Sequence, residues 1–286
     1  MSTSSTMAPG VLSRSPSPEP PLSVKLPRPK AQKLVAEIVK FVPSTVNYTE
    51  LTYEEVEPED GLLVARTLAE HPEIERRTSR VSYNSLEKTL WVRAMPTYLH
   101  DAHQQWVMSA MLDWAYNGSV KKGEHLRITF GVGTTFEIFI GAYASSSKEP
   151  DLYLSARPDR IPSVVIESGW TESFPCLRID KDLWLRGTLE VQYVILLKWS
   201  KVRNDKVKGW IEVWGRGNTG SLLIRELVVF PKPDPRPIED SIRFTKQQLF
   251  GEIPVSNPST VLPLEVPRLR EIAEKILVNL MGLSPC

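Results

Sequence analysis

The order of helical and strand-like segments limits the fold of this chain more than any other feature of its sequence. Segments with a 3.6-residue apolar period are separated by stretches that alternate apolar and polar residues or are wholly apolar. The clearest helix covers 101–117, and the most apolar strand is SVVIES at 163–168. Strands, a helix, further strands and a last helix predict an α+β fold with a mixed β-sheet flanked by helices.

The periodicity predicts ten strands and five helices. The strands are expected at 80–85, 88–94, 125–131, 135–142, 150–155, 163–168, 190–199, 207–215, 222–230 and 242–249. The helices are expected at 31–42, 58–70, 101–117, 175–185 and 267–281.

These segments divide the chain into four predicted parts. Residues 1–30 are rich in Ser and Pro, and we expect them to be disordered because they carry too few large apolar side chains to offset the entropy of ordering. Residues 31–75 form an N-terminal helical segment, 76–235 the core, and 236–286 a C-terminal extension of a strand and a helix.

Composition favours an intracellular protein without a membrane partner. No stretch approaches the ~20 apolar residues of a membrane span, and the N-terminus lacks the apolar run of a secretory signal. Two cysteines, Cys176 and Cys286, provide neither a disulfide framework nor a four-ligand zinc site. We therefore expect a reducing compartment, the cytoplasm or the nucleus.

The charge balance does not suggest a general nucleic-acid binder. The net charge is +1, from 35 basic and 34 acidic residues, whereas affinity for nucleic acid comes largely from neutralised phosphates. The one local basic patch, 198–210, could hold phosphates while Trp199 or Trp210 stacks on bases. The alternative, which we favour, is a hairpin whose polar turn KVRNDKVKG joins two strands with inward tryptophans.

Two acidic residues stand out by their position relative to strands. Asp151 opens the strand PDLYL, and Glu167 lies near the end of the apolar run SVVIES. An acid that ends a buried strand is costly unless it is paired or ligated. Two such carboxylates on neighbouring strands could bind Mg²⁺, which prefers oxygen ligands and can activate an attacking water.

The order of these motifs resembles the Uma2-type branch of the PD-(D/E)xK superfamily. The matching segments are LEKTLWVRAMP, DAHQQW, PDLYL, IPSVVIESGWTES, CLRIDKDLWL and VQYVILLKW, over roughly residues 80–215. The chain is also similar to a group of uncharacterised fungal proteins with the signature ESGWTES…D…WL. The resemblance implies a restriction-endonuclease-like core, Mg²⁺ or Mn²⁺ as cofactor, and DNA or RNA as substrate.

The resemblance assigns Asp151 to the PD aspartate and Glu167 to the second acid, with the Ser168 carbonyl as a third metal ligand. The motif lysine, two residues after the second acid, is replaced by Gly169. Lys181, on the following helix, is the candidate for its charge-stabilising role.

A structural interpretation is favoured for two further residues, His103 and Asp180. His103 shares the face of its helix with apolar residues, which favours a core or capping histidine over a catalytic one. Asp180, beside Lys181, fits a helix-surface or capping acid.

Two functions therefore follow from the sequence. The first is a metal-dependent phosphodiesterase, intact or degenerate, that uses Asp151, Glu167, Lys181 and His103. The second is a non-catalytic binding or scaffold module on the same fold, which the missing lysine and neutral net charge favour. The chain has no G-x-S-x-G nucleophile motif and no P-loop motif.

Overall fold

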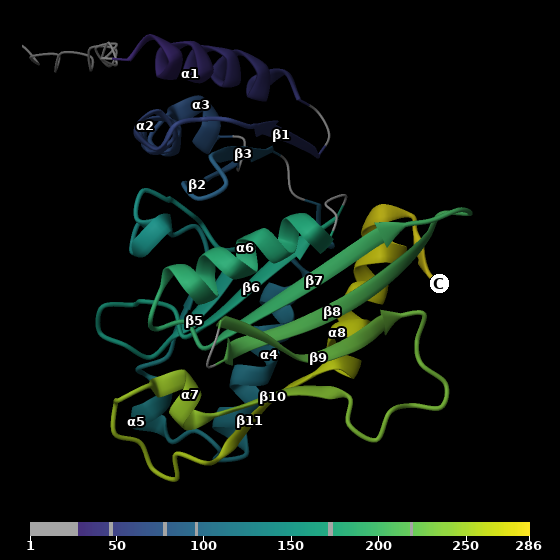
Figure 1. The fold of residues 1–286 in the computed structure, drawn as a ribbon. Helices are drawn as coiled ribbons and strands as arrows, with labels where there is room; N and C mark the ends of the chain where they lie inside the picture. The colour runs from purple at the N-terminus through teal and green to yellow at the C-terminus, as the bar shows by residue number, and fades with distance from the viewer. Residues whose placement is uncertain (1–27, 46–47, 77–78, 95–96, 171–173, 218–219) are drawn as a thin grey trace, which may run out of the picture.

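The computed structural model of the protein describes residues 28–45, 48–76, 79–94, 97–170, 174–217 and 220–286. A small N-terminal unit lies against one end of a larger sheet that carries helices on both faces (Figure 1). The predicted α+β class with sheets flanked by helices is confirmed. The predicted disordered tail lies almost wholly outside the described residues.

The N-terminal unit is a three-stranded antiparallel sheet covered by helices. Its strands are β1 (Thr49–Tyr53), β2 (Arg80–Asn84) and β3 (Thr89–Ala94), in the order β1-β3-β2. Its helices are α1 (Pro29–Phe41), α2 (Pro58–Ala69) and α3 (Pro72–Glu75), with a short 3₁₀ turn at Val42–Ser44. One apolar cluster, which includes residues from Ala31 to Ala94, holds these elements together. The unit thus extends past residue 76, because β1 pairs with β3.

Helix α2 approaches strand β2 very closely, and a glycine makes this possible. A Cβ atom at Gly61 would lie 2.2 Å from the ring of Tyr83, a fully buried residue of β2. The Tyr83 hydroxyl donates a 2.7 Å hydrogen bond to the carbonyl of Val56, just before α2. Any larger side chain at this position would push the helix off the strand.

The main sheet has seven strands in the order β12-β8-β7-β6-β5-β4, and β9 also pairs with β8. The strands are β4 (Thr129–Gly131), β5 (Leu152–Ser155), β6 (Val164–Gly169), β7 (Tyr193–Lys201), β8 (Lys206–Gly217), β9 (Gly220–Phe230) and β12 (Ser284–Pro285). Strand β5 lies between β4 and β6 and is antiparallel to both. Strand β7 is parallel to β6, and helix α6 (Phe174–Gly187) connects the two.

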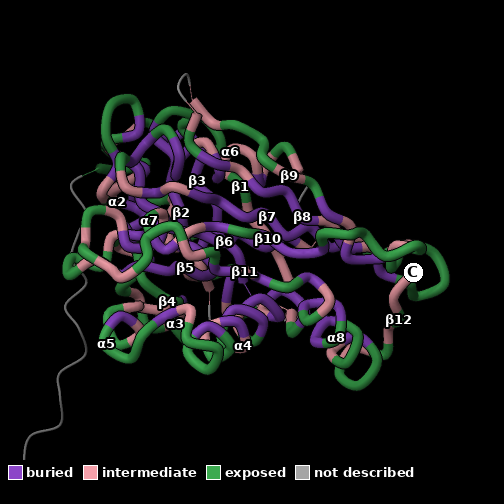
Figure 2. The backbone as a smooth tube through the Cα atoms, turned by 90° about the horizontal axis from the view of Figure 1, so that it is seen from below, coloured by how far each residue is buried: buried purple, intermediate pink, exposed green. Residues whose placement is uncertain are grey.

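Strand β6 is buried on both faces, as its apolar sequence predicts. Val165 packs into the cluster that contains Trp184 of α6. The next residue, Ile166, packs on the opposite face with Trp106 of α4 (Ala102–Tyr116). In Figure 1 helix α6 lies in front of the sheet and α4 and α8 (Val266–Ile276) lie behind it. The view from below shows buried strands between these two helical layers (Figure 2).

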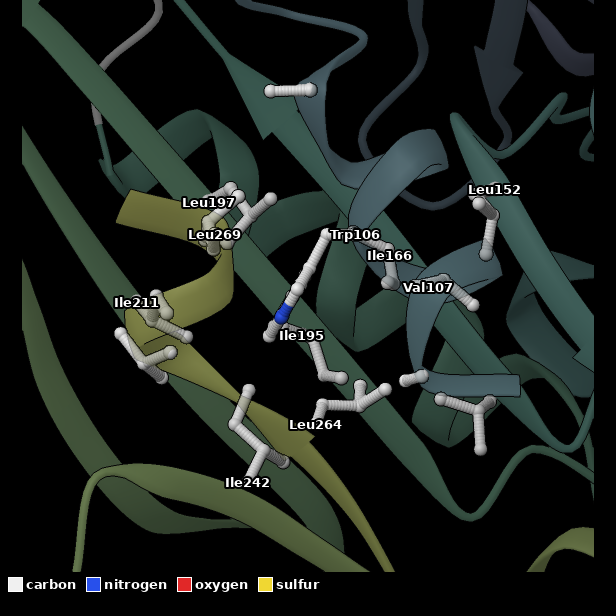
Figure 3. Packing of buried hydrophobic residues seen from close by; sticks show 14 of the residues in the cluster. Trp106, Val107, Leu152, Ile166, Ile195, Leu197, Ile211, Ile242, Leu264 and Leu269 are labelled. Carbon is white, nitrogen blue, oxygen red and sulfur yellow. The ribbon is translucent and has the colours of Figure 1, made fainter. Parts of the chain in front are cut away.

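The C-terminal segment covers the α4 side of the sheet. It comprises the hairpin-like pair β10 (Ser241–Thr245) and β11 (Val261–Glu265), helix α7 (Lys246–Phe250) and helix α8, which continues into a π-type turn at Leu277–Met281. The indole nitrogens of Trp106 and Trp114 donate hydrogen bonds of 2.7 and 2.9 Å to the carbonyls of Glu265 and Pro263. Figure 3 shows Trp106 among the aliphatic side chains of this core. Two tryptophans of one helix therefore anchor β11.

Several predicted elements differ from the structure. Residues 135–142 form no strand but an isolated bridge from Phe136 to Lys148 and a 3₁₀ turn at Gly141–Tyr143. Helix α5 (Lys122–His125) occupies the start of the strand predicted at 125–131. The strand predicted at 242–249 ends at Thr245, whose side chain caps α7. In the segment 135–142, Phe136 and Phe139 pack into the core without strand pairing, so their alternation with other residues resembled a strand.

The other predicted strands and helices are found with small shifts of their ends. The interpretation of 198–210 as a hairpin is confirmed by the antiparallel pair β7–β8. Of the two tryptophans expected to point inward, Trp199 is buried and Trp210 is only partly buried. The ammonium group of Lys198 donates to the carbonyls of Trp170 and Trp199, so this lysine does not contribute to a surface patch. Among the described residues, no helix is both long and apolar enough to cross a membrane.

We expect Trp106→Ala to lower the free energy of unfolding by about 3–5 kcal/mol, because it leaves a large cavity and removes the bond to β11. Urea denaturation measures this change. Tyr116→Ala is the matched control: Tyr116 lies on the same helix and is 97% exposed, so its removal should cost less than about 0.5 kcal/mol. Equal losses in the two variants would contradict the anchoring role of Trp106.

Candidate functional site

Asp151 lies immediately before β5, at the junction between the main sheet and the N-terminal unit. Pairing of Leu152 with Ile166 places Asp151 beside the end of β6. Its Oδ2 accepts a 2.6 Å hydrogen bond from the backbone N–H of Ser168 and lies 3.3 Å from Nε2 of His100. Its Oδ1 is bonded to the guanidinium of Arg80 from strand β2. The carboxylate is completely buried, and both of its oxygens have partners.

Glu167 lies in β6 with its side chain on the α6 side of the sheet and is also completely buried. The indole N–H of Trp184 donates a 2.7 Å hydrogen bond to Oε1. The ammonium of Lys148 lies 3.7 Å from Oε2, which has no hydrogen-bond donor among the described residues. Burial raises the pKa of the Glu167 carboxyl, and the charge of Lys148 opposes this shift.

Asp180 of α6 is a third buried carboxylate. We call Asp151, Glu167 and Asp180, together with the cations that contact them, the carboxylate cluster. Its Oδ2 lies 2.6 Å from the ammonium of Lys148 and 3.2 Å from the guanidinium of Arg93 on β3. Burial disfavours its charged form, but these two cations hold the pKa of the Asp180 carboxyl below its usual range. The prediction of a helix-surface or capping acid at position 180 was therefore wrong, because α6 turns this side chain toward the sheet.

Lys181, the predicted replacement for the motif lysine, points to a different part of the protein. Its ammonium lies 2.6 Å from a carboxylate oxygen of Asp182 and 2.9 Å from the hydroxyl of Ser221, and 4.2 Å from the ring centre of Trp214. The ammonium beside Glu167 belongs instead to Lys148, three residues before Asp151. Successive helical residues point about 100° apart, so α6 cannot direct both Asp180 and Lys181 at Glu167.

His103 is completely buried on the α4 side, where its Nε2 lies 3.3 Å from the backbone carbonyl of Asp151. Its Nδ1 has no partner among the described residues. Burial lowers the pKa of His103 to about 3, and the neighbouring His100 contributes to the shift. The imidazole of His103 therefore contacts the backbone of Asp151 and not its carboxylate. This is the behaviour of a neutral core histidine.

Ser168, the predicted third ligand, contributes its backbone N–H to Asp151. Its hydroxyl is buried and, like Nδ1 of His103 and Oε2 of Glu167, has no hydrogen-bond partner among the described residues. Three polar atoms at the predicted site thus have unused hydrogen-bonding capacity.

The structure adds residues that the sequence did not identify as part of the site. These are Arg80, Arg93, His100, Lys148 and Trp184. The two arginines occupy polar positions of strands that otherwise alternate normally, and Lys148 belongs to a charged stretch that resembles an exposed loop. The lysine of the segment KEPD, three residues before the predicted acid Asp151, is the one sequence signal that could have pointed to Lys148.

The arrangement does not fit a bound divalent cation as it stands. Mg²⁺ and Mn²⁺ require free oxygen ligands, but both oxygens of Asp151 are bonded to protein groups. The three carboxylates already face three cations, Arg80, Arg93 and Lys148. Within the described ranges, no three His, Cys, Asp or Glu side chains are grouped as metal ligands. Chemically, the cluster is a buried network of ion pairs.

Comparison with known proteins does not assign the chain to a family: no protein-family model and no curated protein matches it.

We expect Lys148→Met to lower the free energy of unfolding by about 3–5 kcal/mol, since it leaves buried carboxylates without their shared cation. Lys201→Met is the control, because Lys201 forms a comparable 2.7 Å ion pair with Asp205 but is exposed. That exposed pair should contribute less than about 1 kcal/mol. Urea denaturation at neutral pH measures both, and similar small losses would show that Lys148 does not stabilise the cluster.

The buried imidazole of His103 should make stability depend on pH. Its folded pKa of about 3 lies below the ordinary 6.5, so the unfolded chain binds a proton here between these values and the folded chain does not. Stability is complete above pH 6.5 and is lost as the pH falls toward 3.

Relative to His103→Gln, the wild type should lose about 1.4 kcal/mol of unfolding free energy for each pH unit below 6.5. Urea denaturation of both proteins at pH 7, 6 and 5 tests this difference. His100 is present in both proteins, so its own titration largely cancels. Parallel pH dependence of the two proteins would contradict a buried neutral His103.

Proposed function

We propose that this protein is a degenerate nuclease-like protein, with a restriction-endonuclease-like core, that acts as a non-catalytic binding or scaffold module. The elements that carry the resemblance support this core. Helix α4, strands β5 and β6, helix α6 and strand β7 lie together, with the strands adjacent in one sheet and the helices on its two faces.

The observation that carries the non-catalytic role is the neutralisation of Asp151, Glu167 and Asp180 by the protein itself. All three carboxylates are at most 2% exposed, and a phosphodiester could not reach them in this arrangement. A hydrolytic centre needs oxygen ligands that are free to hold a metal and a path for the substrate. Buried carboxylates that are held in ion pairs serve structure instead.

The surface electrostatics also favour a partner other than nucleic acid at the large cleft between the N-terminal sheet and α6. This cleft has a volume of about 810 Å³ and is lined by Glu50, Glu54, Glu55 and Glu87, with Lys88 as a cation. A concentration of carboxylates repels the phosphates that dominate nucleic-acid affinity.

The two cysteines support an intracellular location, in the cytoplasm or the nucleus. The chain has only two cysteines, Cys176 and Cys286, and both are partly exposed, which suits a reducing compartment.

A metal-dependent phosphodiesterase acting on DNA or RNA, with Mg²⁺ or Mn²⁺, is the second candidate, and the position of Lys148 favours it. This lysine supplies a cation 3.7 Å from Glu167, where Gly169 leaves the motif without one. Such a cation could stabilise charge on a phosphate if the carboxylates were released from their arginine partners.

Measuring the cleavage of nucleic acid distinguishes the non-catalytic module from the phosphodiesterase. We expect the wild type, with Mg²⁺ or Mn²⁺, to cleave single- and double-stranded DNA and RNA no faster than an Asp151→Asn/Glu167→Gln variant, because the acids are engaged. Gel analysis of end-labelled substrates measures the rates. Cleavage that disappears in the variant would establish the phosphodiesterase instead.

If cleavage is found, two lysine variants identify the cation. Lys148→Ala should then reduce the rate by on the order of 10²-fold, the effect of losing one preorganised charge. Lys181→Ala should leave it unchanged, because Lys181 is engaged with Asp182 and Ser221. A loss of rate in Lys181→Ala but not in Lys148→Ala would show that Lys181 supplies the cation.

A further inference from the structure

Helix α4 carries almost no charge, although one of its sides faces solvent. Asp113 is the only Asp, Glu, Lys or Arg among its 15 residues, Ala102–Tyr116. A helix on the surface of a folded protein usually has apolar residues on one side and charged residues on the other. In α4 the inner side buries Trp106, and the outer side presents Met108 and Leu112, which are 53% and 62% exposed. The helix is therefore apolar on its outer side as well.

The neighbouring helix α8 has the ordinary pattern. It lies beside α4 on the same side of the main sheet (Figure 2), and both helices bury apolar residues in the same core. The outer side of α8 is charged, because it carries the exposed residues Arg268, Glu271, Glu274 and Lys275. Two helices that share a core thus differ in their outer sides. This difference indicates that the outer side of α4 meets a protein surface and not only water.

The exposed residues of this outer side form one row along the helix. Positions three and four residues apart lie on the same face of an α-helix, so Met108 and Leu112 are neighbours in the row. Gln105 and Tyr116, which are also exposed, extend it at its two ends. The row is about 16 Å long at 1.5 Å per residue. It has an apolar centre and polar ends, which is the pattern of a small protein interface.

The groups beside this row suit a second copy of the same chain. A cleft of about 330 Å³ between α4 and β11 is lined by residues that include Asp113, Glu265 and Arg268. Arg268 also forms an exposed ion pair of 3.0 Å with Glu271, and such pairs contribute little. A two-fold axis between antiparallel α4 helices brings the same flank of both copies together, so Asp113 of each copy would face Arg268 of the other. The row itself has no charge that would repel its copy, and the amide of Gln105 both donates and accepts hydrogen bonds.

We propose that the outer side of α4 is a self-association surface, on which two copies of the chain pair antiparallel about a two-fold axis. In this dimer Met108 of each copy packs against Leu112 of the other, and Gln105 and Tyr116 lie at the ends of the contact. Truncation of a residue at the rim of an interface changes association little, so Tyr116 is not expected to hold the dimer together. The inference goes beyond the proposed function and does not depend on it, because the row takes no part in the carboxylate cluster.

The test is sedimentation velocity of the full-length protein. A contact of this size should be weak, so we expect the wild type to change from monomer to dimer between roughly 1 and 100 μM. Met108→Glu and Leu112→Glu should each weaken association by roughly tenfold or more, because each buries two unpaired carboxylates in the contact. Val278→Glu is the matched control, since Val278 is 54% exposed but lies in the turn after α8, outside the row. It should associate as the wild type does.

A charge exchange tests the two-fold arrangement. Asp113→Arg and Arg268→Asp should each weaken the dimer, and the Asp113→Arg/Arg268→Asp protein should regain it, because the exchanged charges meet again across the axis. Circular dichroism confirms that each variant is folded, as expected for changes at exposed positions. A wild type that stays monomeric over the whole range would overturn the proposal and assign the face to the N-terminal segment or to a different protein. A dimer that survives both Met108→Glu and Leu112→Glu would overturn it as well.

Discussion

The structure depends on one electrostatic constraint, the burial of three carboxylates at the end of the main sheet. Removing a carboxylate from water costs several kcal/mol unless a cation and hydrogen bonds replace the water. Asp151 directly precedes β5, Glu167 belongs to β6 and Asp180 belongs to α6. Their cations come from β2, from β3 and from the segment before β5. The N-terminal sheet must lie against the main sheet for all of these pairs to form, so the charges determine how the two parts associate.

The sheet beneath the cluster provides the rigid frame. Strand β6 buries Val165 against α6 and Ile166 against α4, and a shift of one residue would exchange its two faces. That register directs Glu167 toward α6 and presents the N–H of Ser168 to Asp151. Packing of apolar residues therefore fixes the geometry of the polar cluster, and the cost of any unpaired charge would in turn oppose slippage of the strand.

These constraints are the reason for our proposal that the chain, although its motifs resemble those of nucleases, acts as a binding or scaffold module. The same carboxylates can serve a metal or an internal salt-bridge network, but they cannot serve both at once. Buried ion pairs can contribute specificity of association without adding net stability. In this protein they connect the N-terminal unit to the main sheet, and the acidic cleft lies beside that unit.

The helices and strands whose apolar residues recur with a clear period could be predicted from the sequence. Helix α4, strand β6, helix α6 and the β7–β8 hairpin follow from local apolar patterns, and the position of Asp151 and Glu167 at strand ends marked them as unusual acids. The stretch 135–142 could not be predicted correctly, because its apolar residues pack individually and not as a paired strand.

Only the tertiary structure decided which charges meet. Arg80 and Asp151 are 71 residues apart, and Arg93 and Asp180 are 87 apart, so no local pattern relates them. The choice of Lys148 over Lys181 depends on the rotation of α6 about its axis, which directs Asp180 to the cluster and Lys181 to Trp214. The sequence by itself determined most of the longer strands and helices and singled out the two acids. The partners of those acids were decided by packing, because the energy that pairs buried charges depends on distance in space and not on separation along the chain.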